Sequence, residues 1–245
     1  MTQPIYAIGD IHGQLGMLEQ ALARIEADGG PEARVVFLGD YVDRGPDSRG
    51  VIELLSKGLD EGRNWTCLLG NHDRMFSMFM EDYPRNDARL LVGYHWLHDR
   101  IGGVETLQSY GVEVPEGIRI YELHAKARQA VPEEHCAFLN ALPDYHQAGE
   151  LLFVHAGIRP GVTLQDQSQD DKIWIRQEFL KDRTEHPWLV VHGHTQIPAP
   201  QHYGNRINLD SGAGFGRSLT TAVFEGKQCW VLADTGRVPL LPETA

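Results

Sequence analysis

The feature that most constrains this chain is a set of short apolar runs that each end in a polar block containing glycine. Every block also carries Asp, Asn or His, and the blocks occupy residues 9–13, 39–45, 70–73, 155–157 and 192–195. Glycine lets the backbone turn sharply and approach a bound group closely. In open α/β sheets, ligands bind at the carboxyl ends of the strands. The pattern therefore predicts an α/β fold in which these blocks meet at one sheet edge.

The N-terminal part alternates between strand and helix patterns. Apolar runs at 5–8, 35–38 and 65–69 predict strands, and the apolar spacing within 15–27 and 48–59 predicts helices between them. Such alternation is typical of right-handed crossovers between the strands of a parallel sheet.

The rest of the chain predicts an insertion and a second sheet. Residues 74–142 are mostly helical in pattern and predict a helical insertion beside the first sheet. Later apolar runs lie closer together, mostly without helices between them, at 151–155, 188–192, 206–209 and 219–224. We expect these runs to form a largely antiparallel sheet that packs face to face on the first. The predicted architecture is two mixed β-sheets flanked by helices, in a single domain that spans residues 1–245.

Charge and cysteine content exclude several classes of protein. The formal net charge is −12, whereas binding to nucleic acid or to an anionic membrane needs a basic surface. No apolar run approaches the ~18 residues that a membrane-spanning helix requires. Cys67, Cys136 and Cys229 form no CxxC pair, which argues against a disulfide framework and a cysteine zinc site. We therefore expect a cytoplasmic protein with neither a nucleic-acid nor a membrane partner.

The polar blocks offer oxygen and imidazole ligands but no thiolate, a set that suits manganese, iron or zinc. One such block is a weak signal, since an Asp often caps a helix and a lone histidine is usually structural. Five blocks, each placed after an apolar run, predict a metal site much more specifically.

These blocks resemble the signature blocks of the calcineurin-like metallophosphoesterase superfamily. Residues 39–45, Gly-Asp-Tyr-Val-Asp-Arg-Gly, resemble in particular the serine/threonine phosphoprotein phosphatases of bacterial and phage type. The blocks span residues 9 to 195, and residues 209–212 also resemble the C-terminal region of that family. The resemblance implies two sheets flanked by helices, with a dinuclear metal centre at one edge.

The resemblance also implies a role for each residue that matches a family motif. Two divalent metal ions, with manganese as our first choice and iron or zinc as alternatives, would share Asp40 as a bridging ligand. A bridging carboxylate allows two cations to lie about 3.5–4 Å apart. The implied metal ligands are Asp10, His12, Asp40, Asn71, His155 and His194.

The implied catalytic residues are His72, Asp43 and Arg44. His72 would protonate the leaving oxygen, because histidine titrates near neutral pH and a carboxylate such as Asp43 favours its charged form. Arg44 would bind the substrate phosphate, together with Asn71 and with Arg176, which stands in a Trp-x-Arg context. The alternative for Arg176 is a surface arginine near acidic residues of its own helix.

Other polar and aromatic residues have less motif support. His192 is separated from His194 by a glycine, so it does not match a paired-histidine motif, and we expect it either to support a metal ligand or to be structural. Arg159 is a candidate substrate contact because it follows the fourth block, but it is most simply a surface turn residue before Pro160 and Gly161. Tyr203 and Phe215 are further candidates for the lining of a substrate cleft, with no motif to support either.

The implied activity is hydrolysis of a phosphomonoester by water that attacks in line, and serine/threonine protein phosphatase is our first hypothesis. Leu69 and Asp73 depart from the eukaryotic phosphatase pattern and favour the bacterial branches. Those branches include diadenosine polyphosphate hydrolases, our alternative, for which the insertion would shape a pocket for two nucleosides. A non-catalytic scaffold is the third hypothesis. The expected partner is a phosphoprotein or a small phosphoester.

Overall fold

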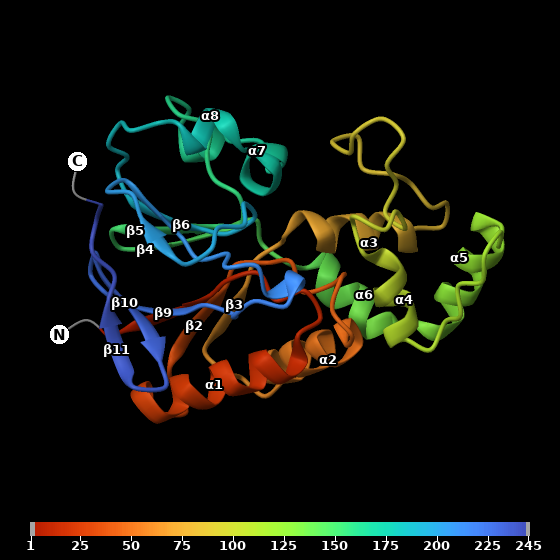
Figure 1. Ribbon diagram of the computed structural model, residues 1–245, viewed down its shortest axis with the longest axis horizontal. Helices are drawn as coiled ribbons and strands as arrows, with labels where there is room; N and C mark the ends of the chain where they lie inside the picture. The colour runs from red at the N-terminus through yellow and green to blue at the C-terminus, as the bar shows by residue number, and fades with distance from the viewer. Residues whose placement is uncertain (1–2, 244–245) are drawn as a thin grey trace.

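The computed structural model describes residues 3–243, which form two stacked β-sheets with helices on both outer sides (Figure 1). The first sheet has the strand order β11-β10-β9-β1-β2-β3, and the second has the order β4-β5-β6-β8-β7. The expected architecture of two mixed sheets flanked by helices is confirmed.

The first sheet begins as the sequence predicts. Its N-terminal elements are β1 (Ile5–Ile8), α1 (Leu15–Gly29), β2 (Arg34–Phe37), α2 (Ser48–Asp60) and β3 (Trp65–Cys67). β1 pairs in parallel with β2, and β2 pairs in parallel with β3. The sheet is completed by antiparallel strands from the far end of the chain, β9 (Thr221–Glu225), β10 (Gln228–Ala233) and β11 (Gly236–Pro239).

The second sheet differs from the expected antiparallel one. It contains β4 (Tyr145–Ala148), β5 (Leu151–Val154), β6 (Leu189–His192), β7 (Gln201–His202) and β8 (Arg206–Asn208). β5–β6 and β6–β8 are parallel pairs, whereas β4–β5 and β7–β8 are antiparallel. The physical reason lies in the long connection from β5 to β6, which is the crossover that a parallel pair requires. Its regular elements are η1 (Leu164–Asp166), α7 (Gln169–Trp174) and α8 (Gln177–Leu180).

The run at 219–224 also lies elsewhere than expected. Its strand is β9, which pairs with β1 in the first sheet. β9 and β10 are joined by a tight turn and pair with each other, so both belong to that sheet.

Alternation along β1 explains how the layers pack. Tyr6 and Ile8 belong to the apolar cluster shared with α1 and α2. Ile5 and Ala7 point to the other side, into the cluster between the two sheets. The outer face of the second sheet packs on the α7–α8 segment, with Val154 against Phe179 in a third cluster. The central strands are thus buried on both faces, which fixes their ends in space.

The insertion is partly helical. It contains α3 (Asn71–Met80), α4 (Gly103–Ser109), α5 (Ile120–Ala130) and α6 (Glu133–Asn140), but residues 81–102 form turns and irregular backbone. The expectation of a mostly helical insertion over 74–142 is therefore wrong for that stretch. Figure 1 shows the insertion as one flank of the molecule, beside α2 and β3. Within residues 3–243 no helix is long and apolar enough to span a membrane.

Candidate active site

The blocks that the sequence singled out meet at the carboxyl ends of the central strands. Asp10 and His12 follow β1, Asp40 to Arg44 follow β2, Asn71 and His72 begin α3, and His155 and His194 follow β5 and β6. All six predicted metal ligands are buried, as are His72 and Asp43. Residues far apart in the sequence are therefore brought to one place.

The backbone at this edge is strained. Within residues 3–243, the non-glycine residues with positive φ are His12 (49°), Asp40 (55°), Asp43 (75°), Arg44 (67°) and His194 (63°). Left-handed conformations cost a non-glycine residue on the order of 1–3 kcal/mol and tend to cluster at functional sites. All five belong to the predicted site, so the fold maintains an unfavourable backbone where the polar side chains converge.

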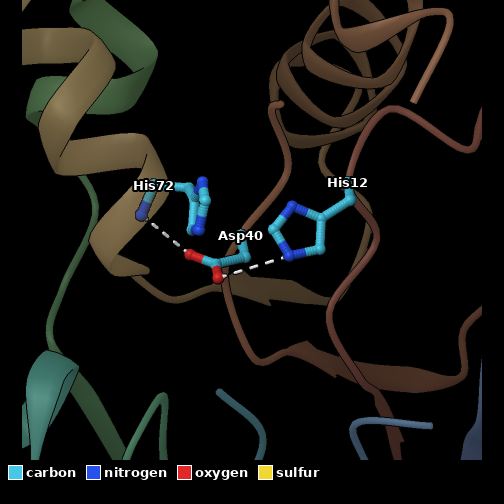
Figure 2. Close-up of side chains that lie close together, drawn as sticks. All are labelled: His12, Asp40 and His72. Atoms are coloured by element: carbon cyan, nitrogen blue, oxygen red, sulfur yellow. Dashed lines mark hydrogen bonds and ion pairs between the residues drawn. The ribbon is translucent and has the colours of Figure 1, made fainter. Parts of the chain in front are cut away.

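Asp40 is shared by two groups of possible metal ligands. Ligand atoms of His12, Asp40 and His72 lie within 4.8 Å of one another, and so do those of Asp40, His155 and His194. Figure 2 shows the first group, with Asp40 Oδ2 3.6 Å from His12 Nε2 and Asp40 Oδ1 accepting the backbone N–H of His72 at 2.9 Å. In the second group, Asp40 Oδ1 lies 3.4 Å from His155 Nε2. This is the arrangement that a bridging carboxylate requires.

The histidines are oriented as metal ligands would be. His12 Nδ1 donates to the carbonyl of Val42 and His155 Nδ1 donates to that of Leu38, both at 2.8 Å, so each Nε2 faces the cluster. Such hydrogen bonds fix the ring and direct the other nitrogen to a metal. His194 Nε2 is buried and has no hydrogen-bond partner within the described residues. An unpartnered buried nitrogen on a ring that lies close to the Asp40 carboxylate and to His155 fits a metal ion.

Asn71 and Asp10 complete the set in different ways. The Asn71 Oδ1 lies 3.0 Å from His155 Nε2, so the two atoms face each other as two ligands of one ion would. The Asp10 carboxylate accepts the backbone N–H of His194 at 2.9 Å and lies outside both groups. Gly193 permits this approach, since a Cβ there would clash with Asp10 Oδ1.

Burial and neighbouring charges shift the pKa values of these groups. Burial and the neighbouring Asp210 raise the pKa of Asp10. Burial also lowers the pKa values of His12 and His194, which favours the neutral imidazole that binds metals. Burial opposes charge on His155, but the carboxylates of Asp40 and Asp10 outweigh it and raise the pKa of His155 to about 9.

The predicted acid, His72, is itself a member of the first group, and the predicted phosphate-binding residue, Arg44, lies beside it. His72 Nδ1 donates to Asp43 Oδ2 at 2.6 Å. The Arg44 guanidinium lies between the two imidazoles, 2.5 Å from His12 Nε2 and 2.9 Å from His72 Nε2. Arg44 therefore contacts a predicted metal ligand and the predicted acid at the same time.

The side chain of Arg176 reaches the site from the α7–α8 junction. Its Nη1 donates to Thr195 Oγ1 at 3.2 Å, next to His194, and its side chain is exposed. Within residues 3–243 it forms no ion pair with Glu178 or Asp182, the alternative that the sequence left open. Arg176 thus lies beside the second ligand group, whereas Arg44 lies beside the first.

The residues with less motif support fall into two groups. His192 is buried against Arg206, and burial lowers its pKa to about 3, so it lies outside the metal-ligand groups. Arg159 pairs with Asp171 at 2.6 Å, and Tyr203 stacks on Arg206. Phe215 alone contacts the site, with its ring 4.7 Å from the Arg44 guanidinium carbon.

Sequence reasoning missed three residues that hold the site loops. Asp73 Oδ2 accepts the N–H groups of Asp40 and Gly70, and Oδ1 accepts that of Tyr41, at 2.8–2.9 Å. Its place in the third block could have revealed it. Trp96 and Thr106 of the insertion both donate to the Asp43 carboxylate. They belong to no motif, and no signal in the sequence marks them.

Comparison with known proteins identifies the family to which this chain belongs. A family model described as calcineurin-like phosphoesterase matches residues 3–219. The chain belongs to this family. Membership makes it a hydrolase of phosphoric ester bonds from a family that depends on a dinuclear metal centre, for which the two ligand groups are candidates. The resemblance stated from the sequence is confirmed.

The curated relatives share nearly the whole length of the chain. It is 26% identical over 238 residues to an asymmetrical bis(5′-nucleosyl)-tetraphosphatase, PrpE, of Bacillus mycoides (strain KBAB4), with 87% of each chain covered. The PrpE of Bacillus thuringiensis (strain Al Hakam) is 24% identical, with 96% of each covered. These names correspond to the alternative function that the sequence suggested.

Solved structures confirm the fold. The crystal structure of a putative diadenosine tetraphosphatase matches with a TM-score of 0.63 at 24% identity. The match covers 98% of this chain and 95% of that structure's chain. A cold-active protein-tyrosine phosphatase from a psychrophilic Shewanella matches with a TM-score of 0.67 at 18% identity. That match covers 98% of this chain and 81% of the phosphatase chain. At these identities the likeness shows the fold alone.

Proposed function

We propose that this chain hydrolyses dinucleoside polyphosphates, cutting a phosphoanhydride bond asymmetrically. The observation that carries the proposal is the similarity, along nearly the whole chain, to relatives named as asymmetrical bis(5′-nucleosyl)-tetraphosphatases. This replaces serine/threonine protein phosphatase, our first hypothesis from the sequence, which the comparisons support less well.

The proposed metal ligands are those that the sequence suggested: Asp10, His12, Asp40, Asn71, His155 and His194. Two divalent cations bound there would activate water as the nucleophile and neutralise charge on the phosphoryl oxygens. Manganese is our first choice because the set combines carboxylate, amide and imidazole ligands without thiolate, and iron or zinc would also accept it.

The chain's own groups would do the rest of the chemistry. Arg44 and Arg176 would bind phosphoryl oxygens from two sides. His72 would then give a proton to the leaving oxygen from Nε2, while Asp43 holds Nδ1. Arg44 now lies 2.9 Å from His72 Nε2, so a phosphate that draws the guanidinium away would free Nε2 to carry that proton.

Phe215 favours a nucleotide over a phosphopeptide. It is 58% exposed, yet one face of its ring is held on the Arg44 guanidinium. An exposed aromatic ring next to a phosphate-binding arginine can stack on a base, and such stacking is worth about 1–3 kcal/mol per base. We propose that Phe215 contacts one base of the substrate.

Compartment and partners follow as part of the proposal. No disulfide joins cysteines within residues 3–243, which suits a reducing, cytoplasmic location. The acidic surface argues against nucleic acid as a partner.

The test is a comparison of initial rates with manganese on diadenosine tetraphosphate, a phosphothreonine peptide, a phosphotyrosine peptide and an aryl phosphate. We expect the highest kcat/KM on the dinucleotide, with a mononucleotide and a nucleoside triphosphate as products. Faster turnover of the phosphothreonine peptide would overturn the proposal in favour of a protein phosphatase.

A matched pair of variants tests the base contact. Phe215→Ala should raise KM for diadenosine tetraphosphate about tenfold and leave KM for inorganic tetraphosphate unchanged, since only the first has bases. Tyr83→Ala is the control, because Tyr83 is 84% exposed and lies just beyond the far end of α3. An equal change on both substrates would mean that Phe215 acts only through Arg44.

A further inference from the structure

Asp43, the partner of His72, is held by the insertion as well as by its own loop. Its carboxylate is fully buried, and Oδ1 accepts from Thr106 Oγ1 at 2.8 Å. Trp96 Nε1 lies 3.1 Å from both carboxylate oxygens, and Oδ2 also accepts from His72 Nδ1 at 2.6 Å. Donors on three side chains thus converge on one carboxylate from different directions, which leaves it a single orientation.

Thr106 also fixes the backbone of Asp43. The Asp43 N–H donates to Thr106 Oγ1 at 2.8 Å and to Ser48 Oγ at 3.1 Å. The Thr106 hydroxyl therefore accepts from one end of Asp43 and donates to the other. This closed arrangement holds a residue whose φ is 75°, a conformation that a non-glycine residue rarely adopts.

Trp96 is held by the same helix that carries His72. Its ring stacks on Phe76 at 5.1 Å and lies 4.7 Å from Phe79, both on α3. Gly103 leaves room for the indole, because a Cβ there would fall 2.6 Å from the ring. His72 and Trp96, which both bind the Asp43 carboxylate, therefore belong to one packed unit.

The insertion also contacts the loop after β2 that carries Arg44. Gly102 accepts the Arg44 N–H through its carbonyl at 3.2 Å, and a Cβ on Gly102 would lie 2.5 Å from that nitrogen. The segment from Trp96 to Thr106 thus docks on Asp43 and Arg44 at several points.

We propose that Trp96 and Thr106 are positioning residues for the general acid, fixing the Asp43 carboxylate so that His72 presents Nε2 to the leaving oxygen. Neither touches the substrate, and both act through Asp43. The inference rests on the role of His72 in the proposed function, which it deepens by making the insertion part of the proton-transfer machinery.

The consequence is specific to proton transfer. A leaving group of high pKa needs a proton in the transition state, whereas one of low pKa leaves as a stable anion without it. Loss of a positioning residue must therefore slow the first kind of substrate and spare the second. A change that merely disturbed the fold or the metal centre would slow both alike.

The experiment compares phenyl phosphate, a poor leaving group, with 2,4-dinitrophenyl phosphate, a good one, on the manganese-loaded full chain. Thr106→Val removes the hydroxyl at nearly constant shape and should lower kcat on phenyl phosphate about tenfold or more, part of the ~10²–10⁴-fold that a general acid contributes. The rate on the dinitrophenyl ester should stay within about threefold of wild type on the same reasoning. Thr106→Ser keeps the hydroxyl and should restore most of the lost rate.

Trp96→Phe provides an independent arm, since it removes the indole N–H and keeps an aromatic ring on Phe76. It should show the same substrate dependence, and thermal unfolding and metal content verify that each variant is folded and loaded. Equal losses on both esters, or no recovery with Thr106→Ser, would overturn the inference.

The outcome is separate from that of the proposed function. The preference of the wild-type chain between dinucleotide and phosphopeptide decides the substrate, whereas the ratio of the two aryl esters decides the positioning role. A chain that prefers phosphopeptides would still show the Thr106 effect if the inference is correct.

Discussion

The strand-end loops and the helical insertion contribute to the same site in different ways. The loops carry side chains that would bind metal and phosphate, and they do so on strained backbone fixed by buried strands. The part of the insertion beyond α3 carries no predicted ligand, yet it reaches Asp43 and Arg44 with Trp96, Gly102 and Thr106. The loops thus supply reactive groups, and the insertion determines how two of them are oriented.

This difference explains why only one region has a sequence signature. A metal ligand must be one of a few residue types, so the chemistry itself marks the loops. A supporting hydrogen bond can come from any donor that the fold delivers to the right place. Substitutions in each region test whether the two regions differ in this way.

The largest effect is expected at the shared ligand. Asp40→Asn should abolish measurable turnover and lose bound metal. Removing the hydrogen-bond partner of a metal ligand already lowers metal affinity by ~10–100-fold, and removing the ligand itself should lower it further. Metal analysis of the purified variant measures this. Asp28→Asn, which removes a carboxylate paired with Arg237 far along the first sheet, is the control and should retain metal. An Asp40→Asn chain with full metal content would contradict the bridging role.

The next effect is expected at the proposed acid. His72→Asn should keep both metal ions and lower turnover of phenyl phosphate by about 10²–10⁴-fold. The rate on phenyl phosphate and the bound metal are both measured for the same preparation of the variant. Undiminished activity on this poor leaving group would show that another residue supplies the proton.

A smaller effect is expected where the insertion docks. Gly102→Ala and Gly111→Ala both place a side chain at positive φ, 93° and 79°, which costs roughly 1–2 kcal/mol of stability. Only the first puts its Cβ against a neighbour, the Arg44 backbone, and overpacking adds about 1–3 kcal/mol. Denaturant unfolding of each variant measures its loss of unfolding free energy. Equal losses would mean that the insertion docks loosely on Arg44.

The smallest effect is expected at the exposed turn of the insertion. Leu91 and Val92 are 71% and 104% exposed, so Leu91→Ser and Val92→Ser should change stability by less than about 0.5 kcal/mol. Turnover of phenyl phosphate should not change. A marked loss of rate on the dinucleotide alone would instead show that this turn contacts substrate.

The sequence predicts much of the fold and the candidate site, for identifiable physical reasons. Strand-end blocks predict convergence because parallel strands end at one edge, so the sequence is enough to group Asp10, Asp40 and Asn71. The mixed pairing of the second sheet could not be predicted, because short apolar runs do not record the direction of their neighbours. That the chain is a single domain stays a prediction.

The supporting contacts could not be predicted at all. Thr106 is 63 residues and Trp96 is 53 residues from Asp43 along the chain, so their hydrogen bonds exist only once the insertion has packed on α3. Neither residue is unusual in its local sequence. Phe215 is a candidate lining residue from the sequence, but its contact with Arg44 likewise arises only in the folded chain.

The most direct test of the central claim is a count of metal ions at the strand-end loops. Metal-stripped wild-type protein is titrated with manganese, and bound metal and turnover are followed together. The structure, with Asp40 shared by two ligand groups, predicts two ions per chain and no activity without them. A chain that binds one ion or none, and still hydrolyses phosphoesters after exhaustive chelation, would contradict it.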